Sequence, residues 1–272
     1  MNIIKKAVGL LRLYRCDVPV IVFLATFAGR FFTTGFTVNI VYEALFIAFL
    51  PYNFVYVLNS ITDVLEDSVN KPSRPIPSGD ITRNEAIVYL MFLAVFSVVG
   101  ISFLFKGIEM FLAFLIIFLG FSYSLPPFVF KKRAFAASVV TGWGVMHPLF
   151  ITGGLELFSF SLSVMFHAIG TTTLKDLSDE KGDKLAGRDV FIKKAGLKAV
   201  LTVSIGLSMV SLISFQFTKY PVASIVPAAS IAVIALSYFF KRDSFENSVY
   251  HKTIWTTALL SVATIVCIHF FY

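Results

Sequence analysis

Charged residues are scarce in this chain of 272 residues. Asp, Glu, Lys and Arg make up only 14% of it, whereas 57% of the residues are hydrophobic and the mean hydropathy is +0.82. A soluble globule with this composition would leave much of its apolar surface in water. The scarcity of charge therefore excludes an ordinary soluble domain and indicates an integral membrane protein.

Cysteine and linker sequences are scarce as well. Cys16 and Cys267 are the only two cysteines and lie in different apolar segments, so a disulfide framework is not expected. A Pro/Gly/Ser-rich linker and low-complexity tracts are absent, and we expect a single membrane domain over residues 1–272. The apolar stretch near the start lacks a convincing small-residue cleavage site and is interpreted as a retained first span.

Long apolar runs are abundant, and about 20 apolar residues suffice for one helical crossing of a bilayer. Uncharged runs cover residues 86–105, 110–130, 134–155, 157–174, 199–218, 220–240 and 253–272. Two further candidates, 17–36 and 38–61, are interrupted by Arg30 and Glu43. The sequence therefore predicts an all-α integral membrane protein with nine transmembrane helices.

The basic residues are distributed unevenly among the predicted loops. Of the 23 Lys and Arg residues, all but Arg30, Lys106 and Lys219 precede the first predicted span or follow an even-numbered one. Because Lys and Arg near span ends are retained in the cytoplasm, we predict an N-in, C-out topology. The net charge of +7 is thus mainly a topology signal, with a second use on an anionic substrate or leaflet, and nucleic acid is not expected as a partner.

Two acidic ladders stand out, both in loops assigned to the cytoplasmic face. The first is Asn59, Asp63 and Asp67, at spacings of four residues. The second is Asp176, Asp179 and Asp183, at spacings of three and four. On a helix of 3.6 residues per turn, each set occupies one stripe.

Clustered carboxylates repel one another, so a positive partner is expected between them. Carboxylate oxygens are hard ligands suited to Mg²⁺, which is typically held together with waters and substrate phosphate oxygens. The ladders therefore predict a metal site that binds a diphosphate. The alternative interpretation is that they are solvated loop acids balanced by nearby lysines.

Basic residues accompany the ladders. Arg74 lies in a loop that Pro72, Pro75 and Pro77 keep from forming a helix, and it is a candidate phosphate clamp. The alternative is that Arg74 only marks topology. Thr82 is expected to cap the next helix, with Glu85 completing a capping box.

The loop after the fourth predicted span reads "YSLPPFVFKKR". It offers the hydroxyl of Tyr123 at the end of the span, followed by Lys131, Lys132 and Arg133. We expect one of these three cations to reach the site and the others to mark topology.

Three sequence stretches together resemble the UbiA superfamily of intramembrane prenyltransferases. They are "NSITDVLEDSVNKPSRPIPSG", "YSLPPFVFKK" and "KDLSDEKGDKLAG". Their order and spacing agree with the family, and the resemblance covers essentially the whole chain. It implies a helical bundle around a central cavity, capped on the cytoplasmic side by the motif loops.

The resemblance also implies roles for individual residues. Asn59, Asp63 and Asp67 would bind one Mg²⁺ ion, and Asp179 and Asp183 a second. The two ions would bridge the diphosphate of a prenyl diphosphate donor, with the four aspartates as the catalytic set. Contacts to the diphosphate would come from Asn59, Arg74, Tyr123, Lys131 and Lys175, together with Asp176, which matches a position that is often acidic in the family.

The expected reaction transfers an isoprenyl group within the cell membrane to a lipophilic acceptor, with membrane lipid around the protein. No Ser-His-Asp or Cys-His arrangement stands out, which suits a reaction in which the acceptor is the nucleophile. His147 and His167 are interpreted as buried structural histidines, with acceptor binding as the alternative.

An aromatic quinone precursor or related ring is the favoured acceptor, and the glycerol phosphate of an ether lipid is the second candidate. From another class, a cation-coupled transporter also uses acids in the membrane, but it tends to place them near the midplane and to show internal repeats. The Asp-Gly-x-x-Ala-Arg pattern of CDP-alcohol phosphotransferases is absent.

Overall fold

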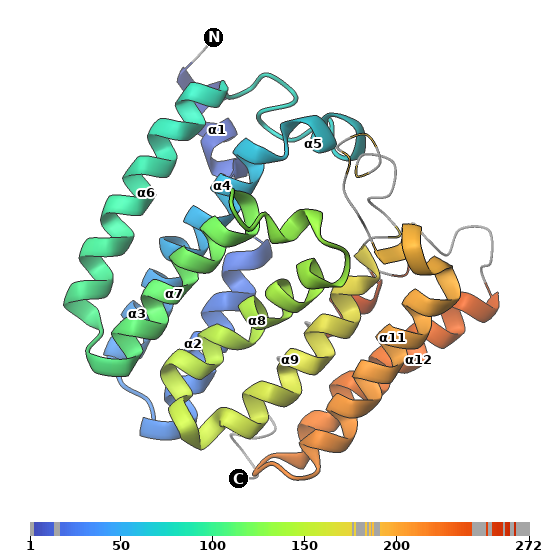
Figure 1. Cartoon of the computed structure of the whole chain (residues 1–272). Coiled ribbons are helices and arrows are strands. Elements are labelled where there is room, and N and C mark those ends of the chain that lie inside the picture. Colours follow the sequence, from blue (N-terminus) through green and yellow to red (C-terminus); the bar gives the residue numbers. More distant parts are fainter. Residues whose placement is uncertain are drawn as a thin grey trace. The chain divides into compact units, whose positions relative to one another are not determined.

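The computed structural model confirms the all-α prediction, because every regular element in the described part of the chain is helical (Figure 1). It describes residues 3–13, 17–175, 177, 183, 185, 187, 191–240, 249, 252–257, 259–261 and 264. These residues fall into two compact units. Unit 1 comprises Met1–Lys132, His147–Gly154 and Lys181–Arg188, and unit 2 comprises Arg133–Met146, Leu155–Glu180 and Asp189–Tyr272.

Unit 1 contains the first seven helices of the chain. They are α1 (Ile3–Leu13), α2 (Asp17–Thr34), α3 (Val38–Phe49), α4 (Pro51–Thr62), α5 (Val64–Asn70), α6 (Arg83–Leu104) and α7 (Gly107–Ser124), followed by the short 3-10 helix η1 (Phe130–Lys132). Helix α8 (Ala134–Gly153) begins in unit 2 and ends in unit 1. Within unit 1, α4 packs against α3, α6 and α7 (Figure 1).

Local sequence explains where these helices begin and end. Pro51 opens α4, at a position where its missing N–H is not needed. Thr82 caps α6: its hydroxyl accepts from the Glu85 amide at 3.3 Å, and the Glu85 carboxylate accepts from the Thr82 amide at 2.9 Å, as predicted. Helix α7 ends at Ser124, earlier than the predicted 110–130 span, because the Pro126-Pro127 pair cannot continue it.

Close packing of helices in unit 1 depends on small residues. A Cβ added at Gly100 of α6 would lie 2.0 Å from the ring of Phe46, and one at Gly120 of α7 would lie 2.7 Å from Val55. Membrane helices lack a strong hydrophobic drive between them, so close backbone approach of this kind supplies much of their association.

Unit 2 contains α9 (Phe158–Thr173), α11 (Phe191–Phe215), the 3-10 helix η3 (Pro221–Ser224) and α12 (Ile225–Phe240). The 3-10 helix η2 (Gly154–Leu157) connects α8 to α9. Helix α11 packs against both α9 and α12 (Figure 1). Its backbone leaves helical geometry at Gly196, where φ is +77°.

Within the residues that the structure describes, six stretches are long and apolar enough to cross a membrane. They are Val38–Thr62, Arg83–Leu104, Gly107–Ser124, Phe135–Thr173, Ala195–Phe215 and Pro221–Phe239, with Pro19–Thr34 as a shorter apolar helix. They support an integral membrane protein. The predicted spans 134–155 and 157–174 fall in one such stretch, and 253–272 lies largely outside the described residues. The count of nine spans, the orientation, the central cavity and the single domain stay predictions.

Candidate functional site

The first acidic ladder lies where α4 meets α5. The predicted single helical stripe is wrong in one detail, because the chain leaves helical geometry at Asp63 (φ −103°, ψ 15°), which separates the two helices. The amide bonds still continue through the junction, with Asp63 N donating to Asn59 O and Asp67 N to Asp63 O. The junction redirects the chain without breaking its hydrogen bonding.

Asp63 is the centre of a buried polar group. Its Oδ2 accepts a hydrogen bond from Asn59 Nδ2 at 2.7 Å, and its Oδ1 accepts one from Lys131 Nζ at 2.6 Å. Lys131 also donates to the hydroxyl of Thr62 at 2.6 Å. The side chains of Lys131 and Asp63 are only 3% and 7% exposed. Such a buried pair is stable only because each charge neutralises the other.

The three clustered cations of the η1 region differ in how deeply they are buried. Lys131 is buried against Asp63, whereas Lys132 and Arg133 are exposed. The three residues are adjacent in sequence, so charge alone could not rank them. Their ranking comes from the turn that follows Pro126-Pro127 and the 3-10 helix η1, which point one side chain inward.

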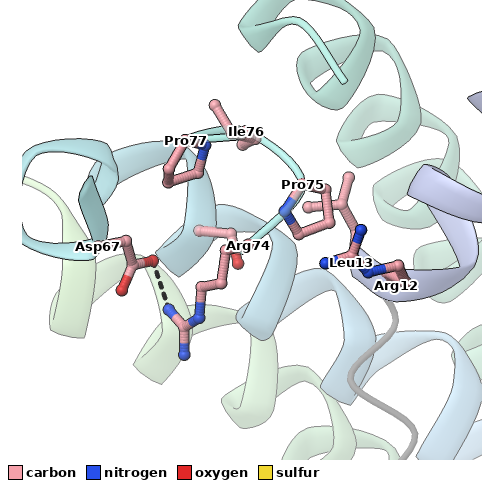
Figure 2. Close-up of a pocket in the computed structure, with 8 residues that line it drawn as sticks. Arg12, Leu13, Asp67, Arg74, Pro75, Ile76 and Pro77 are labelled. Carbon is pink, nitrogen blue, oxygen red and sulfur yellow. Dashed lines mark hydrogen bonds and ion pairs between the residues drawn. The ribbon is translucent and has the colours of Figure 1, made fainter. Parts of the chain in front are cut away.

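Asp67 is paired with Arg74, a second predicted phosphate ligand. Arg74 Nη1 donates to Asp67 Oδ2, as Figure 2 shows, and the two side chains are 17% and 6% exposed. Arg74 comes from the proline-rich loop, whose backbone bonds include Arg74 N to Lys71 O and Ser78 N to Arg74 O. The loop therefore directs Arg74 back onto the helix that precedes it.

A small pocket lies beside this pair. It has a volume of about 20 Å³ and is lined by Arg12, Leu13, Ser60, Asp67, Arg74, Pro75, Ile76 and Pro77 (Figure 2). Sequence reasoning missed Arg12, Ser60 and the buried Glu66 as neighbours of the site. The position of Ser60 seven residues before Asp67 was the available signal for that residue, whereas nothing in the sequence marked Arg12.

The remaining predicted residues are described in part. Tyr123 is half-buried one residue before the end of α7, and Asp183 is buried in unit 1. Lys175 is half-buried just beyond α9, in unit 2. Asp176 and Asp179 lie outside the described residues. The structure thus brings together Asn59, Asp63 and Lys131, and separately Asp67 and Arg74.

The donor set of the first ladder fits a hard divalent cation. Asn59 Oδ1 is buried and has no hydrogen-bond partner in the part of the chain that the structure describes. Together with the carboxylates of Asp63 and Asp67, it offers the oxygen atoms that Mg²⁺ prefers. Among the described residues there is no group of three His, Cys, Asp or Glu side chains close enough for a metal. The fit therefore depends on the amide oxygen of Asn59.

Comparison with known proteins gives the family of the chain. The family model of the UbiA prenyltransferase family matches residues 18–255. The chain belongs to this family. A UbiA relative, the 2-acylphloroglucinol 4-prenyltransferase of Humulus lupulus, is 30% identical over 211 residues, which is 71% of this chain and 51% of that protein.

Other relatives act on different acceptors, as their names state. The digeranylgeranylglyceryl phosphate synthase of Thermococcus sibiricus is 25% identical over 206 residues, 71% of this chain and 66% of that protein. The chain spans about half the length of the plant UbiA proteins it matches.

Solved structures share the UbiA fold. A UbiA homologue from Archaeoglobus fulgidus, bound to GPP and Mg²⁺, has a TM-score of 0.72 at 19% identity and covers 95% of this chain and 98% of its own. A structure of digeranylgeranylglyceryl phosphate synthase also has a TM-score of 0.72, at 22% identity, with 96% and 98% covered.

Proposed function

We propose that this UbiA protein is an Mg²⁺-dependent intramembrane prenyltransferase. It would transfer an isoprenyl group from a prenyl diphosphate to a lipophilic acceptor. The observation that carries the proposal is the pair of buried carboxylate–cation contacts, Asp63 with Lys131 and Asp67 with Arg74, beside the unpartnered amide oxygen of Asn59. Carboxylates and cationic side chains held together in this way suit a ligand that brings both a metal cation and a diphosphate anion.

The metal would be held by oxygen atoms of both ladders. Asn59, Asp63 and Asp67 are the proposed ligands of one ion, and Asp179 and Asp183 of a second. When bound, Mg²⁺ neutralises charge on the leaving diphosphate. The UbiA homologue solved with GPP and Mg²⁺ supports a divalent cation of this kind.

Lys131 and Arg74 are the proposed diphosphate ligands. Lys131 donates to Asp63 and to Thr62, so its ammonium group lies at the ladder where the diphosphate is proposed to bind. Arg74 donates through Nη1 to Asp67, and its planar guanidinium is suited to contact phosphate oxygens through two nitrogens at once. Tyr123, Lys175 and Asp176 are proposed to complete the diphosphate shell.

In the reaction, the bond between the prenyl carbon and the diphosphate oxygen breaks, and the diphosphate leaves with the electron pair. The acceptor then forms a bond to that carbon and loses a proton. Fixed cations at the leaving oxygens favour the first step, since they are already oriented toward the charge that develops. A dry apolar surrounding keeps water from capturing the prenyl group.

We place this site at the cytoplasmic face of the cell membrane, in an N-in, C-out arrangement of nine spans within one domain. The positive-inside distribution of Lys and Arg supports this orientation. An aromatic ring is the favoured acceptor, since the plant relative at 30% identity prenylates an acylphloroglucinol by name. Ether-lipid synthesis is the second candidate, because relatives at 25% and 28% identity are digeranylgeranylglyceryl phosphate synthases.

The test is a transfer assay with detergent-purified protein. Geranyl, farnesyl and geranylgeranyl diphosphate are each offered with Mg²⁺ and a panel containing hydroxybenzoate, homogentisate, an acylphloroglucinol and geranylgeranylglyceryl phosphate. A prenylated product detected by mass spectrometry supports the proposal and identifies the acceptor class. Release of no diphosphate with any donor, together with cation uptake into liposomes, would instead favour transport.

A further inference from the structure

Helix α1 holds the loop of residues 71–82, which carries Arg74. The guanidinium of Arg12 donates through Nη1 to Asp80 Oδ2 at 2.7 Å and through Nη2 to the carbonyl of Ser73. Ser73 lies near the start of the loop and Asp80 near its end. A single planar side chain on α1 therefore joins both arms of the loop.

Apolar packing supports the same contact. Leu13 is buried and packs in one cluster with Ile81 and Ile76. Gly9 approaches the loop so closely that an added Cβ would lie 2.8 Å from Ile81 Cγ1. Lys6, one turn earlier, forms an ion pair with Glu85 at the start of α6. Successive turns of α1 thus contact the loop or the helix after it.

The loop's own hydrogen bonds leave a gap that Arg12 fills. Backbone bonds run from Ser78 N to Arg74 O at 2.9 Å, from Gly79 N to Ile76 O at 3.1 Å and from Ile81 N to Pro75 O at 3.0 Å. The carbonyl of Ser73, which immediately precedes Arg74, accepts its hydrogen bond from Arg12 in the described part of the chain. The peptide that sets the direction of Arg74 is therefore fixed from outside the loop.

Figure 2 shows how the two arginines relate. Arg74 turns toward Asp67, while Arg12 approaches the loop from α1 on the other side of Pro75. Both residues line the small pocket, but only Arg74 contacts a ladder carboxylate. Arg12 is thus suited to act on the site through Arg74 and not directly.

We infer that Arg12 is a positioning residue, which holds the Ser73–Asp80 segment so that Arg74 meets the diphosphate of the donor. This inference rests on the proposed function of Arg74. It predicts a specific pattern: loss of Arg12 weakens donor binding and leaves the chemical step nearly intact. It also predicts that a lysine cannot replace Arg12 fully, because an ammonium group lacks the planar fork that reaches both acceptors.

The experiment compares Arg12→Gln and Arg12→Lys with Arg83→Gln as the matched control. Arg83 is an exposed basic residue at the start of α6, only three positions after Asp80. For Arg12→Gln we expect the KM for the donor to rise about tenfold, which corresponds to about 1.4 kcal/mol, while kcat changes less than about twofold. Arg12→Lys should fall between the wild type and Arg12→Gln, and Arg83→Gln should match the wild type.

A second measurement does not depend on turnover. Hydrogen exchange of the loop amides of Ser78, Gly79 and Ile81 reports whether the loop's backbone bonds stay closed. We expect faster exchange of these amides in Arg12→Gln than in Arg83→Gln, with unchanged exchange in α7 as the sign that the helices remain folded.

The two readouts separate the possible failures. Unchanged exchange of these amides in Arg12→Gln would overturn the inference that Arg12 holds the loop, whatever the values of the donor KM and kcat. Faster exchange with an unchanged donor KM, or a fall in kcat alone, would overturn the link from Arg12 to Arg74. If the wild type binds no prenyl diphosphate, the proposed function fails, while the exchange data still decide whether α1 holds the loop.

Discussion

Two clusters of charged side chains in unit 1, one half-buried and one largely buried, differ in how completely their hydrogen-bonding groups are used. In one, Arg30 of α2 donates through Nε to Glu43 of α3 at 3.0 Å and through both Nη atoms to the two oxygens of Glu109 of α7, at 2.8 Å each. The other is the ladder cluster of Asn59, Asp63, Lys131, Asp67 and Arg74. The first cluster engages all three guanidinium nitrogens of Arg30, whereas in the second the amide oxygen of Asn59 has no hydrogen-bond partner among the described residues.

A structural ion cluster and a binding site in a membrane protein can be distinguished by how many of their hydrogen-bonding groups already have partners within the protein. The Arg30 cluster joins three helices and leaves its guanidinium little capacity for a ligand. The ladder cluster contains two acids, two bases and an unpartnered Asn59 Oδ1, so a bridging anion and its metal can be inserted without leaving a charge unpaired. We therefore propose that the first cluster supports the structure and that the second binds the ligand.

The largest expected difference between the two clusters comes from removing one carboxylate charge from each of them. Asp63→Asn keeps the size of the side chain and an oxygen that accepts from Lys131, but replaces a charged proposed metal ligand with a neutral and weaker one. We expect transfer activity to fall at least about 100-fold, as for other losses of electrostatic stabilisation at a reacting centre. The matched variant Glu109→Gln should retain nearly full activity. Equal losses in the two variants, at equal folded fractions, would remove the distinction.

The second prediction concerns stability. Arg30→Ala leaves Glu43 and Glu109 without their cation, and losing charge-assisted hydrogen bonds among these half-buried side chains costs about 1.5–3 kcal/mol. We expect a clearly lower Tm by differential scanning fluorimetry in detergent, with the donor Kd unchanged in the fraction that remains folded. A donor Kd that rises with no change in Tm would place Arg30 in the binding machinery.

The third prediction uses neighbouring lysines. Lys131→Met removes a charge-assisted contact to the diphosphate and should weaken donor binding by about 1.5–3 kcal/mol. Lys132→Met, at the exposed neighbouring position, should leave the donor Kd unaltered. Because Lys131→Met also strands Asp63, Lys131→Arg serves as the folding control and should recover part of the affinity. The assignment fails if Lys132→Met has the larger effect.

The smallest expected effect belongs to Arg74→Lys. The charge remains, but one hydrogen bond of the planar fork is lost, at a cost of about 0.5–1.5 kcal/mol. We expect a several-fold weaker donor Kd by titration, and no change for the exposed control Arg83→Lys. An unaltered Kd would return Arg74 to a role in topology alone.

Sequence reasoning predicted the helical class and most of the apolar spans because hydrophobic runs of this length have few other uses. It also placed the α6 cap, since Thr82 and Glu85 stand at the capping-box spacing. It overran the end of α7, because hydropathy does not register that Pro126 and Pro127 stop a helix before the apolar run ends.

The site was predicted in its residue types but not in its partners. The spacing of Asp63 and Asp67 indicated two related acids, but not the helix break at Asp63 or the distribution of one cation to each carboxylate. The contact of Lys131 with Asp63 joins residues 68 positions apart, and that of Arg74 with Asp67 depends on how the proline-rich loop folds back, so neither follows from the spacing of the acids. The role of Arg12 is of the same kind, since a residue at a helix end gives no sign in sequence of the loop it contacts.

We propose above all that the ladder cluster binds a prenyl diphosphate through a divalent cation. The most direct test is titration of purified wild-type protein with geranylgeranyl diphosphate by calorimetry, first with Mg²⁺, then with excess EDTA, then with Mg²⁺ restored. We predict saturable binding of geranylgeranyl diphosphate that disappears with EDTA and returns when Mg²⁺ is restored. An identical Kd in EDTA, or no binding of this or any shorter prenyl diphosphate in Mg²⁺, would contradict it.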